Sequence, residues 1–171
     1  MTPYQRLKRR ITKFEFIQSG ILLFMPLVLV FLSGEMRPSI SNYTYSEVSD
    51  WFCVLLAIAG TMFVRNGVDN NRHWYNIILG CCLIGVALTP HLDIPYWHYF
   101  FAGTFFIGSC FVMVFFSSPK QRMYKFLASI FIIIGMVGYF GLNWYSLFYA
   151  EWIGMLPISI HFVLESLEKI D

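Results

Sequence analysis

Apolar residues fill six stretches of the chain, and short polar segments separate them. A helix needs about 20 mostly apolar residues to cross the hydrocarbon core of a bilayer. The pattern therefore predicts an all-α, polytopic membrane protein, a single domain over residues 1–171 built as a six-transmembrane-helix bundle. The expected spans, of which the second and third are short and weak, are residues 14–33, 51–67, 74–90, 97–117, 125–142 and 145–166.

Composition agrees with this class. The chain is 57% hydrophobic and only 13% charged, with a mean hydropathy of +0.61. A soluble domain carries about 25% charged residues, so this chain lacks the polar groups to cover a surface in water. The six spans and their connectors use nearly the whole length, and no separate soluble domain fits.

The basic residues predict the orientation. Six spans starting from a cytoplasmic N-terminus place four segments inside, residues 1–13, 65–73, 118–125 and 167–171. These segments hold 11 of the 12 lysines and arginines, and only Arg37 lies outside. Cytoplasmic loops carry such an excess, which favours two cytoplasmic termini. The net charge of +2 reflects this asymmetry and indicates no nucleic-acid partner.

The first span resembles a secretory signal because Arg6, Lys8, Arg9 and Arg10 precede a long apolar run. That run is longer than a signal peptide needs, and no A-x-A cleavage pattern follows it. We therefore expect a retained membrane anchor.

Three acid–base residues lie near the outer ends of their spans. Placing a charged group in a membrane costs free energy, so such residues usually have a structural or functional role. Asp50, His98 and Glu151 each begin a row of residues at helical spacing, and small residues in such rows mark helix contacts in a membrane. The three are therefore expected to meet. The rows continue through Cys53, Ala57, Gly60 and Thr61, through Ala102, Phe105 and Ser109, and through Gly154, Met155 and Ile158.

The outer loop 34–50 adds polar groups that could cover this cluster. Arg37 suits a phosphate or carboxylate, because guanidinium groups bind both. Ser39, Ser41 and Tyr45 supply hydrogen-bond partners. These residues predict an extracytoplasmic site for a lipid head group or a small amphiphile. The alternative is a salt bridge from Arg37 to Asp50 or Glu151, since a buried acid needs a partner in any case.

A metal site is a second candidate chemistry. His91, Asp93 and His98 have the donor types that zinc uses, but no H-E-x-x-H or H-x-x-x-H spacing supports them. A zinc ion is therefore a possible ligand of these residues but not a required one, and the sequence indicates no other cofactor. The alternative is that His98 only hydrogen-bonds a carboxylate inside the bundle.

Two further functions come from the same residues. A proton or ion pathway needs ionisable groups at every depth, and the middle of the bundle offers only Thr61, Ser109 and Ser159. Transport is therefore disfavoured. Intramembrane polar residues often only join helices, which leaves open a non-catalytic accessory or immunity-type protein. The expected partners are membrane lipids, another membrane protein or a second copy of the chain.

Four short motifs carry a resemblance that covers most of the chain. They are Arg37-Pro38-Ser39-Ile40-Ser41-Asn42-Tyr43, Asp50-Trp51-Phe52, Arg65-Asn66-Gly67-Val68-Asp69 and Gly85-Val86-Ala87-Leu88-Thr89-Pro90. With them the chain resembles a group of uncharacterised bacterial six-helix membrane proteins. The resemblance implies fold, topology and a bacterial inner-membrane location, and it implies no activity.

A weaker resemblance is to membrane hydrolases of the ceramidase and adiponectin-receptor type. Those proteins gather Ser, Asp and His around zinc at one membrane face, which would imply a metal-dependent lipid hydrolase. This chain departs from them in having six spans rather than seven and in lacking their closing H-x-x-x-H. Its last span offers Glu151 and a distant His161 instead.

Overall fold

The computed structural model describes residues 3–69, 73–116 and 119–167, with side chains from residue 14 onward. Three positions named above lie outside the described residues. They are Arg72 and Lys169, two of the basic residues expected on the cytoplasmic side, and residue 117 at the end of the fourth expected span. The elements are α1 (Pro3–Ser33), η1 (Ser41–Tyr45), α2 (Ser49–Asp69), α3 (Tyr75–Leu88), α4 (Pro95–Phe111), the π-helical turn η3 (Val112–Phe116), α5 (Arg122–Phe140) and α6 (Leu147–Ser166).

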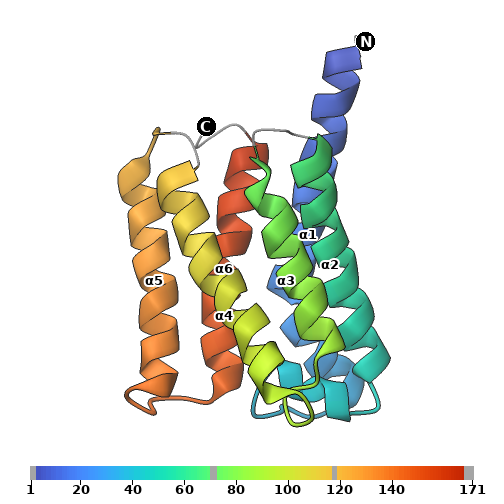
Figure 1. The fold of residues 1–171 in the computed structure, drawn as a ribbon. Helices are drawn as coiled ribbons and strands as arrows, with labels where there is room; N and C mark the ends of the chain where they lie inside the picture. The colour runs from blue at the N-terminus through green and yellow to red at the C-terminus, as the bar shows by residue number, and fades with distance from the viewer. Residues whose placement is uncertain (1–2, 70–72, 117–118, 168–171) are drawn as a thin grey trace.

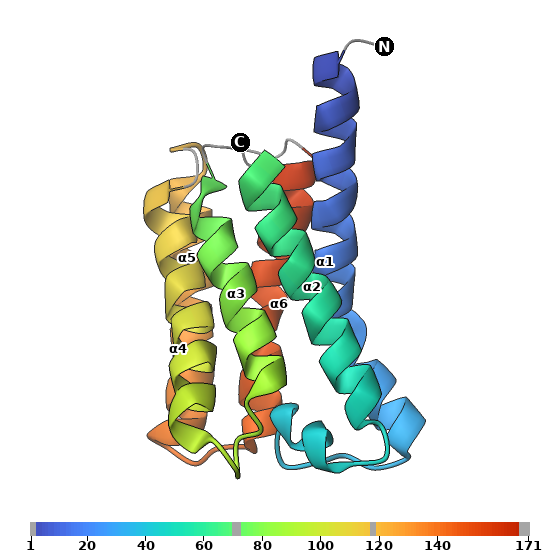
Figure 2. The same cartoon turned by 45° about the vertical axis from the view of Figure 1, so that its right-hand side comes forward.

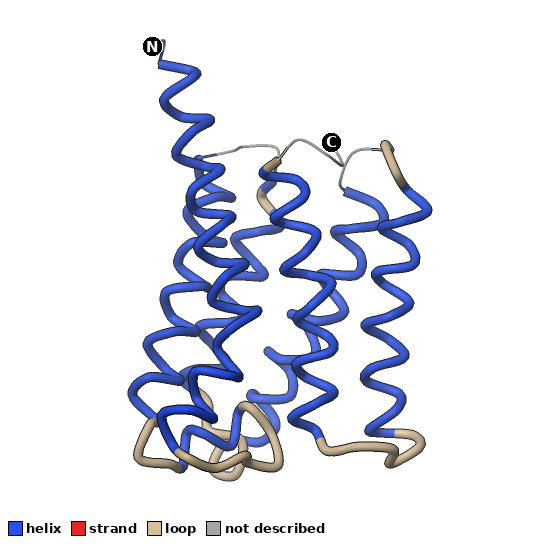
Figure 3. The backbone as a smooth tube through the Cα atoms, turned by 180° about the vertical axis from the view of Figure 1, so that it is seen from behind, coloured by secondary structure: helices blue, strands red, loops and turns tan. Residues whose placement is uncertain are grey.

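The helices run up and down in one bundle, and consecutive helices pack side by side. Helix α6 returns between α1 and α5, so that it packs against both (Figure 1). Helix α1 begins and α6 ends at the same end of the bundle, which we call the terminal end. The connections 34–48, 89–94 and 141–146 lie at the opposite, loop end. Figure 3 shows that helices connected by loops make up the described part of the chain, which contains no β-strand.

Within the residues that the structure describes, five helices are long and apolar enough to cross a membrane. The third expected span is the exception, since α3 has 14 residues and rises only about 21 Å. It ends at Leu88 because Pro90 disfavours helical backbone at Thr89, and the Thr89 hydroxyl donates to the Gly85 carbonyl at 2.7 Å. The bundle therefore has six apolar helices, of which one is too short to span alone.

Large apolar side chains cover the outer surface of the bundle as well as its core. Phe31 is 86% exposed, Leu88 72% and Phe140 65%. In water such a surface would be an extended apolar patch that soluble proteins avoid. The outward-facing side chains are therefore compatible with a protein that is embedded in lipid.

Helix α1 extends well beyond the rest of the bundle at the terminal end (Figure 2). This extension begins at Pro3, earlier than the expected span at residue 14. Deeper in the bundle, Pro26 leaves the Leu22 carbonyl without its usual helical donor. The indole of Trp152 donates to the neighbouring Leu23 carbonyl at 3.1 Å, which joins α6 to α1 at this level.

Helices α2 and α3 make the closest helix contact, where Gly60 faces Gly80. A Cβ atom at Gly60 would lie 2.7 Å from the Gly80 carbonyl oxygen, and one at Gly80 would meet the Gly60 carbonyl oxygen and the Val64 backbone. Small residues let helix backbones approach in this way within a membrane. The row of Asn76, Gly80, Leu83 and Ala87 is buried, as its helical spacing predicts.

Replacing Gly80 by alanine should destabilise the bundle, because its new methyl group would collide with backbone that cannot move aside. We expect a loss of about 1–3 kcal/mol, measured as a lower midpoint of thermal unfolding. Gly103→Ala is the matched control, because nothing lies within 4 Å of a Cβ atom there. Equal midpoints for the two variants would contradict the close packing.

Candidate functional site

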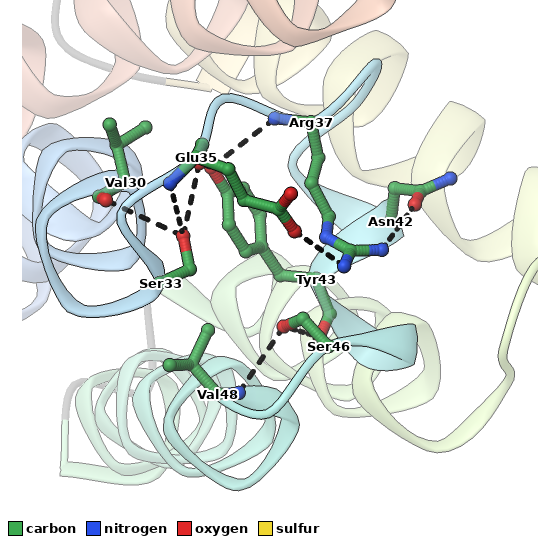
Figure 4. Close-up of polar contacts among 8 residues, drawn as sticks. All are labelled: Val30, Ser33, Glu35, Arg37, Asn42, Tyr43, Ser46 and Val48. Atoms are coloured by element: carbon green, nitrogen blue, oxygen red, sulfur yellow. Dashed lines mark hydrogen bonds and ion pairs between the residues drawn. The ribbon is translucent and has the colours of Figure 1, made fainter.

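The 34–48 loop folds over the loop end of the bundle and is held there by Tyr43. This side chain is fully buried, and its hydroxyl donates to the Glu35 carbonyl at 2.7 Å. The Phe148 backbone N–H of α6 donates to the Pro38 carbonyl at 2.8 Å. Figure 4 shows Tyr43 beneath the loop, with Ser46 and Val48 leading into α2. The loop is therefore a packed cover rather than a free connection.

The Arg37 side chain pairs with residues of its own loop. Its guanidinium lies 2.5 Å from the Glu35 carboxylate and donates to the Asn42 side-chain oxygen at 3.4 Å (Figure 4). It pairs with neither Asp50 nor Glu151, which were its expected alternatives. A pair this exposed contributes little stability, so Arg37 shapes the loop surface and does not neutralise a buried acid.

Glu151 joins the loop to α6 from inside the bundle. One of its carboxylate oxygens accepts the Ile40 backbone N–H at 2.6 Å, and the other accepts the Ser41 hydroxyl at 3.3 Å. The Ser41 and Ser39 hydroxyl oxygens are 3.1 Å apart, and Ser39 accepts the Asn42 N–H at 3.0 Å. Both carboxyl oxygens accept donors from one short segment, so this carboxyl group anchors residues 39–42.

His98 is 3% exposed and lies in the first turn of α4. Its Nδ1 is 2.6 Å from the Thr89 carbonyl oxygen. A carbonyl can only accept, so Nδ1 carries the proton and Nε2 of the neutral ring has a lone pair. Pro95 at the start of α4 suits the first helical turn and places His98 on the inward face, with Phe105 and Ser109 buried further along the same face.

Ser41, His98 and Glu151 line one cavity of about 50 Å³ beneath the loop. Admitting one water takes roughly 10–15 Å³, so the space holds a group of a few atoms. The other lining residues are apolar and come from the loop, α1, α2, α3, α4 and α6: Met25, Ile40, Phe52, Leu56, Leu83, Val86, Ala102, Phe105, Phe106 and Met155.

Asp50 departs from the expected cluster. It is exposed in the first turn of α2 and does not line the cavity. There its carboxylate complements the positive end of the helix dipole, which needs no partner inside the bundle. The inward face of α2 is instead Phe52, Leu56, Ala59, Gly60 and Phe63, while Thr61 is exposed. The expected row from Asp50 was set by its small residues, whereas large residues fill the core.

The candidate metal residues make contacts of another kind. The Tyr45 hydroxyl donates to the Asp93 carboxylate at 3.2 Å and accepts the Leu92 N–H at 2.8 Å. The His91 ring lies edge-on to Tyr45 with centroids 5.4 Å apart, and 5.6 Å from the His98 ring. Among the described residues, no group of three or more His, Cys, Asp or Glu side chains is placed to hold a metal ion. These contacts join the two loops.

The Ile40 backbone N–H is the site group that no sequence pattern indicates, because every residue except proline carries the same donor. Its neighbours Ser39 and Ser41 were the only available signal. The pairing depends on Ile40 being buried, at 3% exposure, so that its N–H points at α6.

Residues 24–166 match a family of unknown function, DUF7103. The chain belongs to this family. The matched region contains the whole loop-end cavity and begins within α1. No curated protein and no solved structure matches the chain. Membership in DUF7103 agrees with the expected uncharacterised family.

Partial burial lowers the pKa of His91 from its ordinary 6.5, and nearby Asp93 offsets this only in part. The folded protein therefore binds this proton less tightly than the unfolded chain does. The His91 contribution should lower stability as pH falls through about 6.5, and level off below the folded pKa. Imidazole NMR shifts should give a pKa under 6.5, and His91→Gln should remove this part of the pH dependence. A measured pKa above 6.5 would contradict the burial.

Proposed function

We propose that the protein is a membrane-embedded binding protein whose loop-end cavity holds the polar head of a single-chain amphiphile. The observation that carries this is the Glu151 carboxylate, which lines an apolar cavity and accepts hydrogen bonds from Ile40 and Ser41. Burying a carboxylate is costly unless donors or a cation compensate it. Two neutral donors compensate in part, and a positively charged ligand would complete the compensation.

The chemistry of the cavity favours a head group that donates hydrogen bonds. Glu151 is an acceptor when ionised, and the lone pair of His98 Nε2 is an acceptor in the neutral ring. Arg37, which would suit a phosphate, is not among the lining residues. A primary ammonium fits these groups best, since it supplies three donors and a positive charge. A hydroxyl group satisfies the same acceptors without the charge.

The size of the cavity supports a small head. About 50 Å³ admits an ammonium or hydroxymethyl group together with the first carbons of a chain, which would lie against Phe106 and Met155. A complete phospholipid head group is larger than this space. The expected lipid head group is therefore a compact one that carries several hydrogen-bond donors.

We further propose that the chain crosses a bacterial inner membrane several times, with both termini in the cytoplasm. The described basic residues Arg65, Lys120, Arg122 and Lys125 belong to the terminal end, and Arg37 belongs to the loop end. The described tryptophan and tyrosine side chains that are exposed, apart from Trp74, lie at the loop end, and these two residue types are enriched at membrane–water interfaces. The side chains at the loop end are Trp51, Tyr96, Trp97, Tyr99, Trp144 and Tyr149.

Reporter fusions test this orientation. A cytoplasm-active reporter fused after residue 171 should be active, and an export-dependent reporter inserted at Glu47, an exposed position of the loop, should also be active. The positive-inside distribution of charge is the physical reason. The opposite pattern at both positions would reverse the orientation.

Ligand binding is tested with three amphiphiles that share one chain length, namely tetradecylamine, tetradecanol and tetradecanoic acid. In nanodiscs, the amine should bind the protein most tightly and raise its thermal unfolding midpoint most. Glu151→Gln should weaken amine binding about 10-fold or more, because a charge-assisted hydrogen bond contributes about 1.5–3 kcal/mol.

Asp50→Asn is the matched control, because it removes an exposed carboxylate at the same end of the bundle without touching the cavity. It should leave amine affinity unchanged. If the acid binds as tightly as the amine, or if the two variants behave alike, the proposed site is wrong.

A further inference from the structure

A second set of buried polar residues lies in the bundle toward the terminal end. None of its members lines the loop-end cavity. Its members come from four helices and are at most 5% exposed. We call them the polar layer: Glu15, Gln18 and Ser19 of α1, Asn66 of α2, Asn76 of α3 and Ser109 of α4.

Glu15 connects the polar layer across three helices. One carboxylate oxygen accepts the Asn66 side-chain N–H at 2.9 Å, and the other accepts the Ser166 hydroxyl of α6 at 2.5 Å. Gln18 and Ser19 follow Glu15 by about one turn. A buried carboxylate of this kind joins helices tightly, because both of its oxygens already have donors.

Neighbouring helices bring the remaining members to a similar depth. A Cβ atom at Gly67 would lie 2.6 Å from the Ile77 side chain, which sets Asn66 beside the start of α3 where Asn76 lies. A Cβ atom at Gly108 would lie 3.0 Å from the Leu79 side chain, so Ser109 is about one turn from Asn76 in depth. The helix packing thus gathers these polar groups in one part of the bundle.

Seven polar atoms of the polar layer are buried without a hydrogen-bond partner in the structure. They belong to side chains that are at most 2% exposed. Each such atom costs about 1–3 kcal/mol if it is left dry. The atoms are both amide atoms of Gln18, both amide atoms of Asn76, the Asn66 Oδ1, the Ser19 Oγ and the Ser109 Oγ.

The chemistry of these atoms indicates their ligand. The side chains with unpartnered atoms are uncharged, and together they offer both donors and acceptors. An anion or a cation would satisfy only half of them, whereas water satisfies both kinds. Internal waters typically make about three hydrogen bonds to otherwise unpaired buried groups.

Three phenylalanines separate the polar layer from the loop-end cavity. Phe63 of α2 meets Phe105 of α4 edge-on with ring centroids 6.0 Å apart, and it meets Phe162 of α6 with centroids 4.9 Å apart. All three are at most 3% exposed, and Phe105 also lines the cavity. The two polar regions are therefore distinct.

We propose that the polar layer is an internal water-binding site, which makes the terminal-end part of the bundle aqueous up to the three phenylalanines. Glu15 organises the site, and the amides of Gln18 and Asn76 bind the waters. This proposal is independent of the amphiphile site, because it involves none of its side chains.

Cysteine labelling tests the presence of water, since a thiol reacts with a methanethiosulfonate only as the thiolate, which needs a polar environment. The native residues Cys53, Cys81, Cys82 and Cys110 are first replaced by alanine. Ser19→Cys, Ser109→Cys and Leu22→Cys are then made in that background, reconstituted in nanodiscs and treated with 2-aminoethyl methanethiosulfonate.

Mass spectrometry of the intact protein follows the labelling. Leu22 is the control, because it is fully buried in apolar surroundings one turn beyond Ser19. Both serine positions should label at least about 10-fold faster than position 22. Equal, slow labelling at all three positions would show a dry interior and overturn the proposal.

Apolar substitutions provide a second and separate readout. If the Gln18 and Asn76 amides are dry, Gln18→Met and Asn76→Leu remove an unpaired group and should raise the midpoint of thermal unfolding. If the amides bind water, both substitutions remove hydrogen bonds and the midpoints should fall. A rise in both midpoints would overturn the proposal even if labelling is fast.

Discussion

The buried carboxylate of Glu151 is the constraint on which the loop end depends. A charge inside an apolar bundle is stable only when donors surround it, and the donors here are the Ile40 N–H and the Ser41 hydroxyl. The loop must fold inward to present them, and Tyr43 and Phe148 hold it there. The carboxylate and the covering loop therefore stabilise each other, and the cavity beneath exists because both are in place.

The same physical rule applies at the other end of the bundle with a different outcome. There Glu15 has two donors, but the amides of Gln18 and Asn76 have no protein partners. At the loop end, one backbone N–H and one hydroxyl donate to the acid, and a small cavity lies beside it. At the terminal end, polar atoms of neighbouring side chains are buried without protein partners. Helix α6 reaches both regions, with Glu151 near its start and Ser166 at its end.

The helices were largely predictable because hydropathy is a sum over local residues. The apolar runs located all six, and α3 proved shorter because Pro90 ends it. The facing of α3 and α4 was also predictable. The row from Asn76 is buried at every position, and the row from His98 is buried except at the partly exposed Ala102. Which face of α2 points inward was not predictable from the sequence. Two rows at helical spacing compete on this helix, one that begins at Phe52 and one of small residues that begins at Asp50. Packing against α1 and α3 selected Phe52.

The sequence by itself determined the class of the protein, the helices and the two polar residues His98 and Glu151 that share a cavity, since each of these follows from residue type and helical period. Only the tertiary structure decided that Ile40 donates to Glu151, that Asp50 faces outward and that Arg37 pairs within its own loop. The reason is that these outcomes depend on backbone donors and on competition between side chains for one interior. The polar layer was not predicted from the sequence, because only packing decides that Gln18 of α1 is buried and that its amide and that of Asn76 lack protein partners.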